Sequence, residues 1–224
     1  MSDELVLLHI CCGPCAIWPV DWLRGQGFAV DGFWFNPNVH PRREYQARLD
    51  SCRRYAAMHA LTLHEQDEYG LQPFLAKLWP QRVAKPERCE QCYIMRLEAT
   101  ARKAAQLGVG IISTTLQVSP FQDHLLIEEA GRKAAAEWGV RWLQHDWRGG
   151  FQAGRTKSRL LELYQQSYCG CLFSEDERYR RTGPRTDTTP DGSQVRGARG
   201  FAVTDQPGRE HHHQDTSEAG DPPK

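Results

Sequence analysis

Short apolar runs alternate along the chain with longer segments in which apolar residues recur every three or four positions. The first pattern is typical of strands buried inside a sheet, and the second is typical of helices that cover a sheet. The first run ends at Gly13 and Pro14, which suit a tight turn and a first helical turn. The predicted strands are 5–10, 28–35, 60–64, 109–115 and 140–145, and the predicted helices are 16–24, 42–60, 90–107, 122–138 and 151–166.

This alternation predicts an α/β fold, in which a single three-layer domain has helices on both faces of a parallel sheet. Ligands of such sheets bind beyond the carboxyl ends of the strands. Cys11 and Cys12 lie at that end of the first predicted strand, and residues 113–115 end the fourth. We therefore expect the functional site at this edge of the sheet.

The pattern stops near residue 181. Residues 182–224 contain six Gly, five Pro and only six apolar residues. A segment of this composition buries too little apolar surface to offset the entropy lost on ordering. We therefore expect one domain over 1–181 and a disordered tail over 182–224. The whole chain has 28 basic and 28 acidic residues, whereas the predicted domain is slightly basic, with 23 against 21.

The N-terminal residues predict neither export nor membrane insertion. Asp3 and Glu4 stand where a signal peptide would be basic, and the apolar run that follows is too short for one. No apolar run approaches the ~18–20 residues of a membrane span. We therefore expect a cytoplasmic protein. In a reducing compartment, its eight cysteines indicate metal binding or redox chemistry rather than a disulfide framework.

Seven of the eight cysteines fall into three tight groups. A gap of two residues places two thiolates within reach of one metal centre, and the second group also opens a predicted helix, whose dipole favours the thiolate form. We expect the first two groups to meet at one edge of the sheet. Cys52 stands alone on a helix, as a small core residue would. The groups are Cys11-Cys12-Gly-Pro-Cys15, Cys89-Glu-Gln-Cys92 and Cys169-Gly-Cys171.

A structural zinc ion is the simplest alternative for the first two groups. Structural zinc usually stabilises small domains that lack a core, and a tetrahedral zinc ion takes only four ligands. A domain of this length can form a core, and seven grouped cysteines exceed four. Cys169 and Cys171 differ from the other groups, because thiols one residue apart either form a strained, easily reduced disulfide or share a metal.

Several segments, taken in chain order, make the sequence similar to the QueH-type epoxyqueuosine reductases. The similarity covers residues 5 to about 175 and includes all three cysteine groups. One departure is visible, since Gln165-Gln166-Ser167 precedes Tyr168 where the family usually has a more basic sequence. The segments are His9–Cys15; His40-Pro41 with Glu44, Tyr45 and Arg48; Arg88–Tyr93 with Arg96 and Leu97; Ser113–Leu116 with Ser119 and Pro120; and Tyr168–Cys171.

The resemblance implies reduction of the epoxide of epoxyqueuosine, at the wobble position of tRNAs with GUN anticodons, to the cyclopentene of queuosine. This is the last step of queuosine biosynthesis. The resemblance also implies a Rossmann-like fold related to the nucleotide-hydrolase-like group, together with a [4Fe-4S] cluster and no cobalamin. A low-potential electron donor would then be a partner besides the tRNA.

Removal of the epoxide oxygen as water takes two electrons and two protons, whereas one [4Fe-4S] centre delivers one electron at a time. Cys169 and Cys171 are therefore the candidate catalytic pair, either as a dithiol that becomes a disulfide or as ligands of a second, mononuclear iron. Adjacent residues of an extended segment point to opposite faces, so Cys11 and Cys12 serve different centres unless the chain turns between them. The candidate cluster ligands are Cys11, Cys12, Cys15, Cys89 and Cys92.

Candidate substrate-binding residues lie on or beside the helix predicted over 42–60. Arginines contact phosphates and aromatic rings stack on extruded bases, although a solvated helix face has the same composition. Candidate proton donors to the leaving oxygen are His9, Tyr93, Asp123 and His124. The candidate tRNA contacts are Arg42, Arg43, Tyr45 and Arg48, followed by Arg53, Arg54 and Tyr55; Trp34 and Phe35 fit core packing better.

Two other functions share some of these features. An iron–sulfur tRNA thiolation enzyme would have CxxC pairs on a related sheet, but it would bind ATP through a Ser-Gly-Gly-rich loop after the first strand. This chain has Cys11-Cys12-Gly-Pro-Cys15 there. A zinc-stabilised RNA-binding module would have the same cysteines without redox chemistry. The colour of the purified protein separates the last alternative from an iron–sulfur enzyme.

Overall fold

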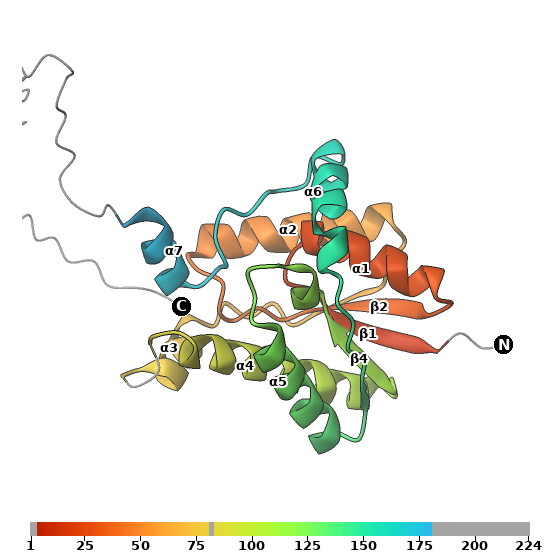
Figure 1. The fold of residues 1–224 in the computed structure, drawn as a ribbon, viewed down its shortest axis with the longest axis horizontal. Helices are drawn as coiled ribbons and strands as arrows, with labels where there is room; N and C mark the ends of the chain where they lie inside the picture. The colour runs from red at the N-terminus through yellow and green to blue at the C-terminus, as the bar shows by residue number, and fades with distance from the viewer. Residues whose placement is uncertain (1–3, 81–82, 181–224) are drawn as a thin grey trace, which may run out of the picture. The chain divides into compact units, whose positions relative to one another are not determined.

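Five parallel strands form one sheet in the order β3-β2-β1-β4-β5 (Figure 1). The structure is a computed structural model, and it describes residues 4–80 and 83–180. The predicted α/β fold with a parallel sheet is therefore confirmed, whereas the predicted tail over 182–224 lies outside the described residues. The strands are β1 (Leu5–His9), β2 (Ala29–Trp34), β3 (Leu63–Glu65), β4 (Ile111–Thr114) and β5 (Arg141–Trp142).

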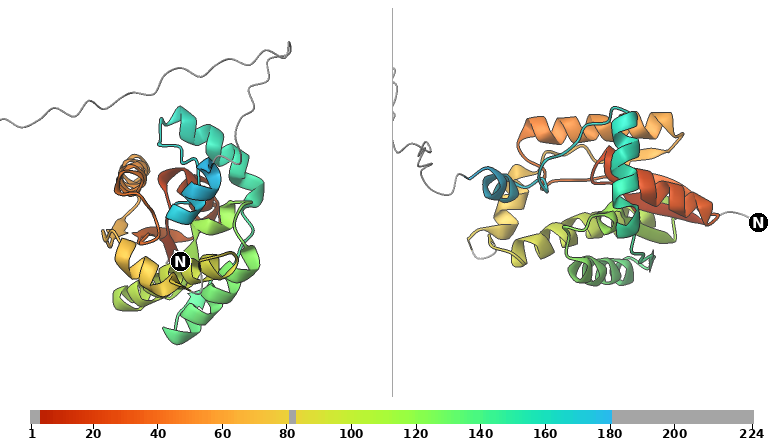
Figure 2. Two further views of the ribbon diagram at one scale, coloured as in Figure 1. Left: turned by 90° about the vertical axis from the view of Figure 1, so that its left-hand side faces the viewer. Right: turned by 45° about the horizontal axis from the view of Figure 1, so that its top comes forward.

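Helices cover both faces of the sheet (Figure 1, Figure 2). One layer contains α1 (Gly13–Gly25), α2 (Arg42–Met58) and α6 (Phe151–Leu160), and the other contains α4 (Glu87–Leu107) and α5 (His124–Glu137). Within the described residues, each helix is too short or too polar to span a bilayer. The shorter elements are α3 (Leu71–Leu78), which packs on α4, α7 (Leu172–Tyr179), and the 3-10 helices η1 (Thr115–Val118) and η2 (Arg148–Gly150).

The central strand β1 is buried on both of its faces. Val6 and Leu8 belong to the hydrophobic core beneath α1 and α2, whereas Leu7 belongs to the core beneath α4 and α5. All three side chains are fully buried. This explains why the strand reads as a continuous apolar run rather than an alternating one, as is usual for a parallel strand with helices on both faces.

The strand order places the functional edge of the sheet. β1 and β4 are neighbours, and the chain leaves β1 toward α1 in one layer but leaves β4 toward η1 and then α5 in the other. Strands whose connections diverge in this way leave a crevice beyond their carboxyl ends, where ligands of α/β proteins bind. Cys11 and Cys12 follow β1 directly at this position.

Several predicted element boundaries differ from the structure, among them those of two strands and one helix. The third strand was expected at 60–64, but Ala60 adopts a positive φ of 46° and turns the chain, so pairing starts at Leu63. The last core helix was expected to reach 166, but α6 ends at Leu160 and Glu162 has a φ of 52°. The strand expected at 140–145 pairs with β4 only at Arg141–Trp142.

Candidate metal centre

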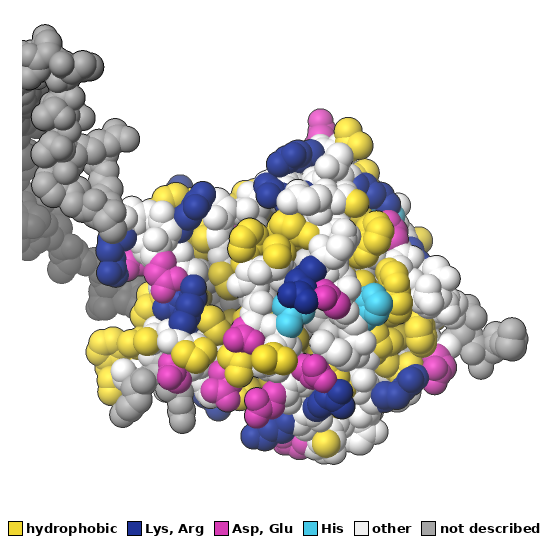
Figure 3. Space-filling model, in the orientation of Figure 1, with side chains coloured by type: hydrophobic (Ala, Val, Ile, Leu, Met, Phe, Trp, Pro, Cys, Tyr) yellow, Lys and Arg dark blue, Asp and Glu magenta, His cyan; other side chains and the backbone are white. Residues whose placement is uncertain are grey.

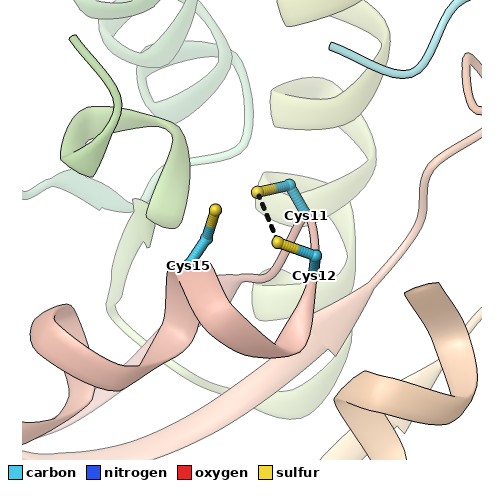
Figure 4. Close-up of side chains that lie close together, drawn as sticks. All are labelled: Cys11, Cys12 and Cys15. Carbon is cyan, nitrogen blue, oxygen red and sulfur yellow. Dashed lines mark hydrogen bonds between the residues drawn. The ribbon is translucent and has the colours of Figure 1, made fainter. Parts of the chain in front are cut away.

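Three cysteine sulfurs gather where β1 ends and α1 begins (Figure 4). The Sγ atoms of Cys11, Cys12 and Cys15 all lie within 4.8 Å of one another, and those of Cys11 and Cys12 are 4.0 Å apart. A bend at Cys11 brings its sulfur to the side of Cys12, so the two do not point to opposite faces. Three thiolate sulfurs at this spacing can hold a metal ion or part of a cluster.

Close packing between α1 and α2 sets the turn that carries this group. A Cβ atom on Gly13 would lie 2.5 Å from the backbone oxygen of Ser51 in α2, so only glycine fits there. Pro14 occupies the first turn of α1, where a backbone N–H has no helical partner. The Gly-Pro pair therefore holds Cys12 and Cys15 at a helix N-terminus, which favours negative charge.

The pKa of Cys11 lies below those of the other two thiols in this group. Hydrogen bonds from the thiols of Cys12 and Cys15, and then one from the Thr115 hydroxyl, lower the pKa of Cys11 well below its usual range. The Thr115 hydroxyl donates to Cys11 Sγ at 3.3 Å. The same contacts with Cys11 raise the pKa values of Cys12 and Cys15. Deprotonation of all three thiols therefore requires a positive charge beside them, which a bound metal provides.

Arg96 is a buried positive charge beside the second cysteine group. It is only 2% exposed, and its Nη2 donates to Cys92 Sγ at 3.0 Å while its Nε donates to the Cys92 carbonyl at 3.0 Å. Within residues 4–80 and 83–180, Arg96 forms no ion pair with a carboxylate. Because a buried charge without a partner costs several kcal/mol, this environment fits an anionic group of metal and thiolates.

The second group lies between the first and the third. Cys89 packs against the hydrophobic cluster that contains Cys11 and Cys12. Cys92 and Cys171 share another buried cluster, in which Phe74 and Leu78 of α3 cover them. Burial, followed by the nearby charges of Cys169 and Cys171, raises the pKa of Cys89. The three groups are thus linked by packing along two hydrophobic clusters, but among the described residues only the sulfurs of Cys11, Cys12 and Cys15 lie within 4.8 Å of one another.

The third group forms the loop that leads into α7. Cys171 is buried at the N-cap of this helix, where its Sγ accepts a hydrogen bond from the Ser174 backbone N–H at 3.4 Å. Cys169 is exposed. Both cysteines are free thiols in the structure. The pair thus combines a sulfur that can meet a substrate with one that is held in place.

Arg48 holds this loop from the α2 side. Its two terminal nitrogens donate to the carbonyls of Cys169 and Tyr168, both at 2.9 Å, and its Nε donates to Glu44 at 2.7 Å. Gly170 has a φ of 132°, and a Cβ atom there would lie 2.9 Å from Arg48 Nη1. The middle residue of the third group must therefore be glycine for Arg48 to reach the loop.

Gln122 is a site residue that sequence reasoning missed. Its Nε2 donates to Cys169 Sγ at 3.5 Å, and its Oε1 accepts a hydrogen bond from the Tyr93 hydroxyl at 2.9 Å. Tyr93 also accepts from the Asp123 backbone N–H at 3.2 Å. The only signal in the sequence was the position of Gln122, shortly after the fourth strand at the carboxyl edge. Burial raises the pKa of Tyr93, so its hydroxyl keeps its proton.

The other candidate proton donors have structural contacts. His9 is fully buried, hydrogen-bonds to Thr114 Oγ1 at 2.7 Å, and has a pKa lowered to about 3 by burial and then by the Arg96 charge. It is therefore neutral and donates no proton of an imidazolium. Asp123 is the N-cap of α5, and its carboxylate accepts from two backbone N–H groups. His124 Nε2 lies 3.0 Å from the Ser119 carbonyl.

The helix assigned to tRNA binding presents only some of its predicted residues to solvent. Arg42 and Arg43 are exposed at its start, and the Arg42 guanidinium lies 4.4 Å from the centre of the Tyr69 ring. Tyr45 and Arg48 are each 1% exposed and therefore offer no surface to an RNA. Tyr45 packs in the core and Arg48 positions the third cysteine group, so Arg42 and Arg43 are the exposed members of the predicted substrate-binding set.

The remaining predicted residues of this face are paired or buried. Arg53 forms ion pairs with Glu65, Asp67 and Asp50, and Arg54 pairs with Glu162. Core positions were predicted for Trp34, Phe35 and Cys52. The structure buries these three side chains, and it also buries Tyr55.

Comparisons with known proteins point to one family. The family model described as "Epoxyqueuosine reductase QueH" matches residues 6–177. A protein of that name from Dehalococcoides mccartyi is 36% identical over 179 residues, which cover 80% of this chain and 96% of that protein. One from Thermotoga maritima is 32% identical and covers 77% and 91% of the two chains. One from Acinetobacter baylyi is 32% identical and covers 82% and 87%.

Proposed function

The chain belongs to the epoxyqueuosine reductase QueH family, and we propose that it reduces epoxyqueuosine to queuosine at the wobble position of tRNAs with GUN anticodons. This reaction completes queuosine biosynthesis, and its tRNA substrate and free thiols suit the cytoplasm. The observation that carries the proposal is the arrangement of thiols around the buried, carboxylate-free guanidinium of Arg96. That arrangement fits an anionic metal–thiolate centre rather than an ordinary ion pair.

The reaction removes one oxygen atom. Two electrons and two protons enter, both C–O bonds of the epoxide break, a C=C bond forms, and the oxygen leaves as water. A low-potential donor protein supplies the electrons, and no cobalamin takes part. The protein must therefore bind the nucleoside, conduct electrons one at a time and deliver protons to a leaving oxygen.

Five cysteines supply the candidate ligands of a [4Fe-4S] cluster. When bound, such a cluster supplies single electrons at low potential. Arg96 balances the negative charge of the thiolates, and Thr115 and the N-terminus of α1 favour negative charge at Cys11 and Cys12. The ligands are drawn from Cys11, Cys12, Cys15, Cys89 and Cys92.

Cys169 and Cys171 complete the reaction. As a dithiol, the pair releases two electrons and two protons when it becomes a disulfide, which equals what the epoxide consumes. As ligands of a second, mononuclear iron, the two sulfurs would instead place a Lewis acid beside the epoxide oxygen. In both forms Arg48 holds the loop, and Gln122 orients the exposed sulfur of Cys169.

Metal content and turnover test the proposal together. Protein prepared without air should contain about four iron and four sulfide per chain, or more iron if a second site is filled. The same preparation should convert epoxyqueuosine in tRNA to queuosine, as measured by nucleoside mass spectrometry. Stoichiometric zinc without acid-labile sulfide would favour the zinc-stabilised RNA-binding module, and ATP-dependent sulfur insertion would favour a thiolation enzyme.

Simultaneous replacement of Arg42 and Arg43 by alanine should weaken tRNA binding without changing the metal content. Each phosphate contact that is lost should reduce the slope of log affinity against log salt by roughly one unit. Arg102→Ala, an exposed change near the far end of α4, is the control. If the double variant binds tRNA like the wild type at every salt concentration, the start of α2 does not contact the phosphates.

A further inference from the structure

Phe121 is exposed to solvent beside the candidate metal centre. Its side chain is 82% exposed, and it directly precedes Gln122, whose amide donates to Cys169 Sγ. The loop around it is ordered: Phe121 N donates to Ser119 Oγ at 3.3 Å, and His124 Nε2 hydrogen-bonds the Ser119 carbonyl. The exposed position of this phenyl ring is therefore part of the folded structure.

A second aromatic ring extends this surface toward Cys15. The Phe151 ring, at the start of α6, meets the Phe121 ring edge to face with the centroids 5.9 Å apart. Phe151 also lines a shallow, mostly apolar groove together with Trp18 and Cys15. The two rings thus connect the groove lined by Cys15 with the loop whose Gln122 contacts Cys169. We call Phe121, Phe151 and Arg155 the aromatic rim.

The charge around the aromatic rim suits a polyanion. Residues 147–161 contain four basic residues and no acidic ones, and two of the four are paired, Arg148 with Asp146 and Lys157 with Asp21. The Arg155 guanidinium lies 5.8 Å from the centre of the Phe151 ring, and within the described residues neither Arg155 nor Arg159 forms an ion pair. Figure 3 shows this face, where hydrophobic side chains lie between α6 and the loop before α5, with Lys and Arg as well as Asp and Glu side chains around them.

We propose that the aromatic rim binds an unpaired nucleobase of the anticodon loop, next to the nucleotide that is reduced. Bases stack on exposed aromatic rings whatever their sequence, and an arginine at the ring adds attraction and contacts phosphate. This inference rests on the proposed function, because it assigns the rim to the same tRNA. It also supplies an aromatic contact in place of the buried Tyr45.

An acidic redox partner is the competing occupant of this face. A protein partner of standard size would bury roughly 800 Å² of this chain, mostly through an apolar patch with a polar border. The rings here are two flat aromatic faces with an arginine at the edge, which is the arrangement that stacks bases and contacts phosphate. A base can stack only if position 121 carries a flat aromatic ring, whereas docking of a protein does not require one.

Substitutions at Phe121 test this demand directly. Phe121→Ala and Phe121→Leu should both weaken binding of the tRNA at least about fivefold, the lower end of what loss of one base–aromatic stack causes, whereas Phe121→Trp should restore it. Leu160→Ala, which removes an equally exposed apolar side chain at the other end of α6, is the matched control. Binding is measured by fluorescence anisotropy on the metal-loaded full chain with epoxyqueuosine-containing tRNA.

Turnover of the same preparations separates the two proposals. If the wild type makes queuosine but Phe121→Ala binds tRNA as tightly as the wild type, the aromatic rim is not a stacking surface, although the proposed function stands. If the wild type makes no queuosine while Phe121→Ala still weakens binding and Phe121→Trp restores it, the rim stands and the proposed function fails. If Phe121→Ala keeps its tRNA affinity and loses turnover only with a protein donor, not with dithionite, the face docks a redox partner and the inference is overturned.

Discussion

Serine at Cys89 or Cys92 is expected to remove or destabilise the metal centre, whereas serine at Cys169 or Cys171 is expected to leave its absorbance intact and abolish reduction of the epoxide. Serine oxygen is a poor ligand for a soft metal site. The first two groups contain five candidate ligands, among them the triad whose sulfurs lie within 4.8 Å, so a set of four does not need the third group. The third group then supplies what a cluster that delivers single electrons does not, either the electrons of a dithiol or a second iron beside the epoxide.

The structure makes serine an informative replacement in the third group. Cys171 is the N-cap of α7, and a serine there caps a helix at least as well, because its hydroxyl accepts the same Ser174 N–H. At Cys169, a serine hydroxyl accepts from Gln122 as the thiol does. Loss of turnover in these variants would therefore reflect the missing sulfur and not a disordered loop.

Anaerobic preparations of the variants should be compared for cluster absorbance and for queuosine formed in tRNA. Cys52→Ala is the control, since Cys52 is fully buried in the core and belongs to none of the three groups. Normal turnover of either third-group variant would make that pair structural. If either variant loses the cluster as completely as Cys89→Ser does, the division of the cysteines into cluster ligands and catalytic pair is wrong.

The fold was largely predictable because its strands and long helices have strong periodic patterns. The two helices that sequence reasoning missed are the eight-residue α3 and α7. α3 contains Pro73, and α7 is mostly polar, so neither has a pattern long enough to indicate a helix. Both pack on the same hydrophobic cluster instead, α3 through Phe74 and Leu78 and α7 through Phe173.

The cysteine groups could be found in the sequence, but their supporting residues could not. Gln122 contacts Cys169 across 47 residues, and no local pattern encodes such a pair. Arg48 is different, because a signal was available. Tyr45, Arg48, Leu49 and Cys52 recur at helical spacing, which places Arg48 on the buried stripe of α2 and not on its solvated face. Charge alone suggested RNA, whereas position on the helix indicates a positioning role.

Arg96→Met is expected to destabilise the metal-loaded protein by about 3–5 kcal/mol, the usual cost of removing one member of a buried charge pair. Methionine keeps the length and much of the packing of the arginine side chain, but it removes the positive charge that donates to Cys92 Sγ. Burial already raises the pKa of Cys92. Without Arg96, the metal-bound thiolate of Cys92 loses this hydrogen bond, so a chelator should also remove the metal faster.

The reduction potential gives a second readout of the same change. An added electron makes the centre more negative, and Arg96 stabilises that charge from within the low-dielectric interior. Arg96→Met should therefore shift the potential to more negative values and slow electron entry. Arg96→Lys keeps a charge but loses the planar donor pair, so its reduction potential should lie between those of the methionine variant and the wild type.

The metal-free protein provides the decisive comparison for Arg96. When Cys92 is a neutral thiol, the buried guanidinium balances less charge, so Arg96→Met should cost clearly less stability in this form than in the loaded one. Denaturant unfolding of both forms, with Arg102→Met as an exposed control on the same helix, measures this difference. An equal loss in the two forms, with an unchanged reduction potential, would mean that Arg96 contributes only packing. A loss confined to the loaded form would identify Arg96 as the counter-charge of the metal centre.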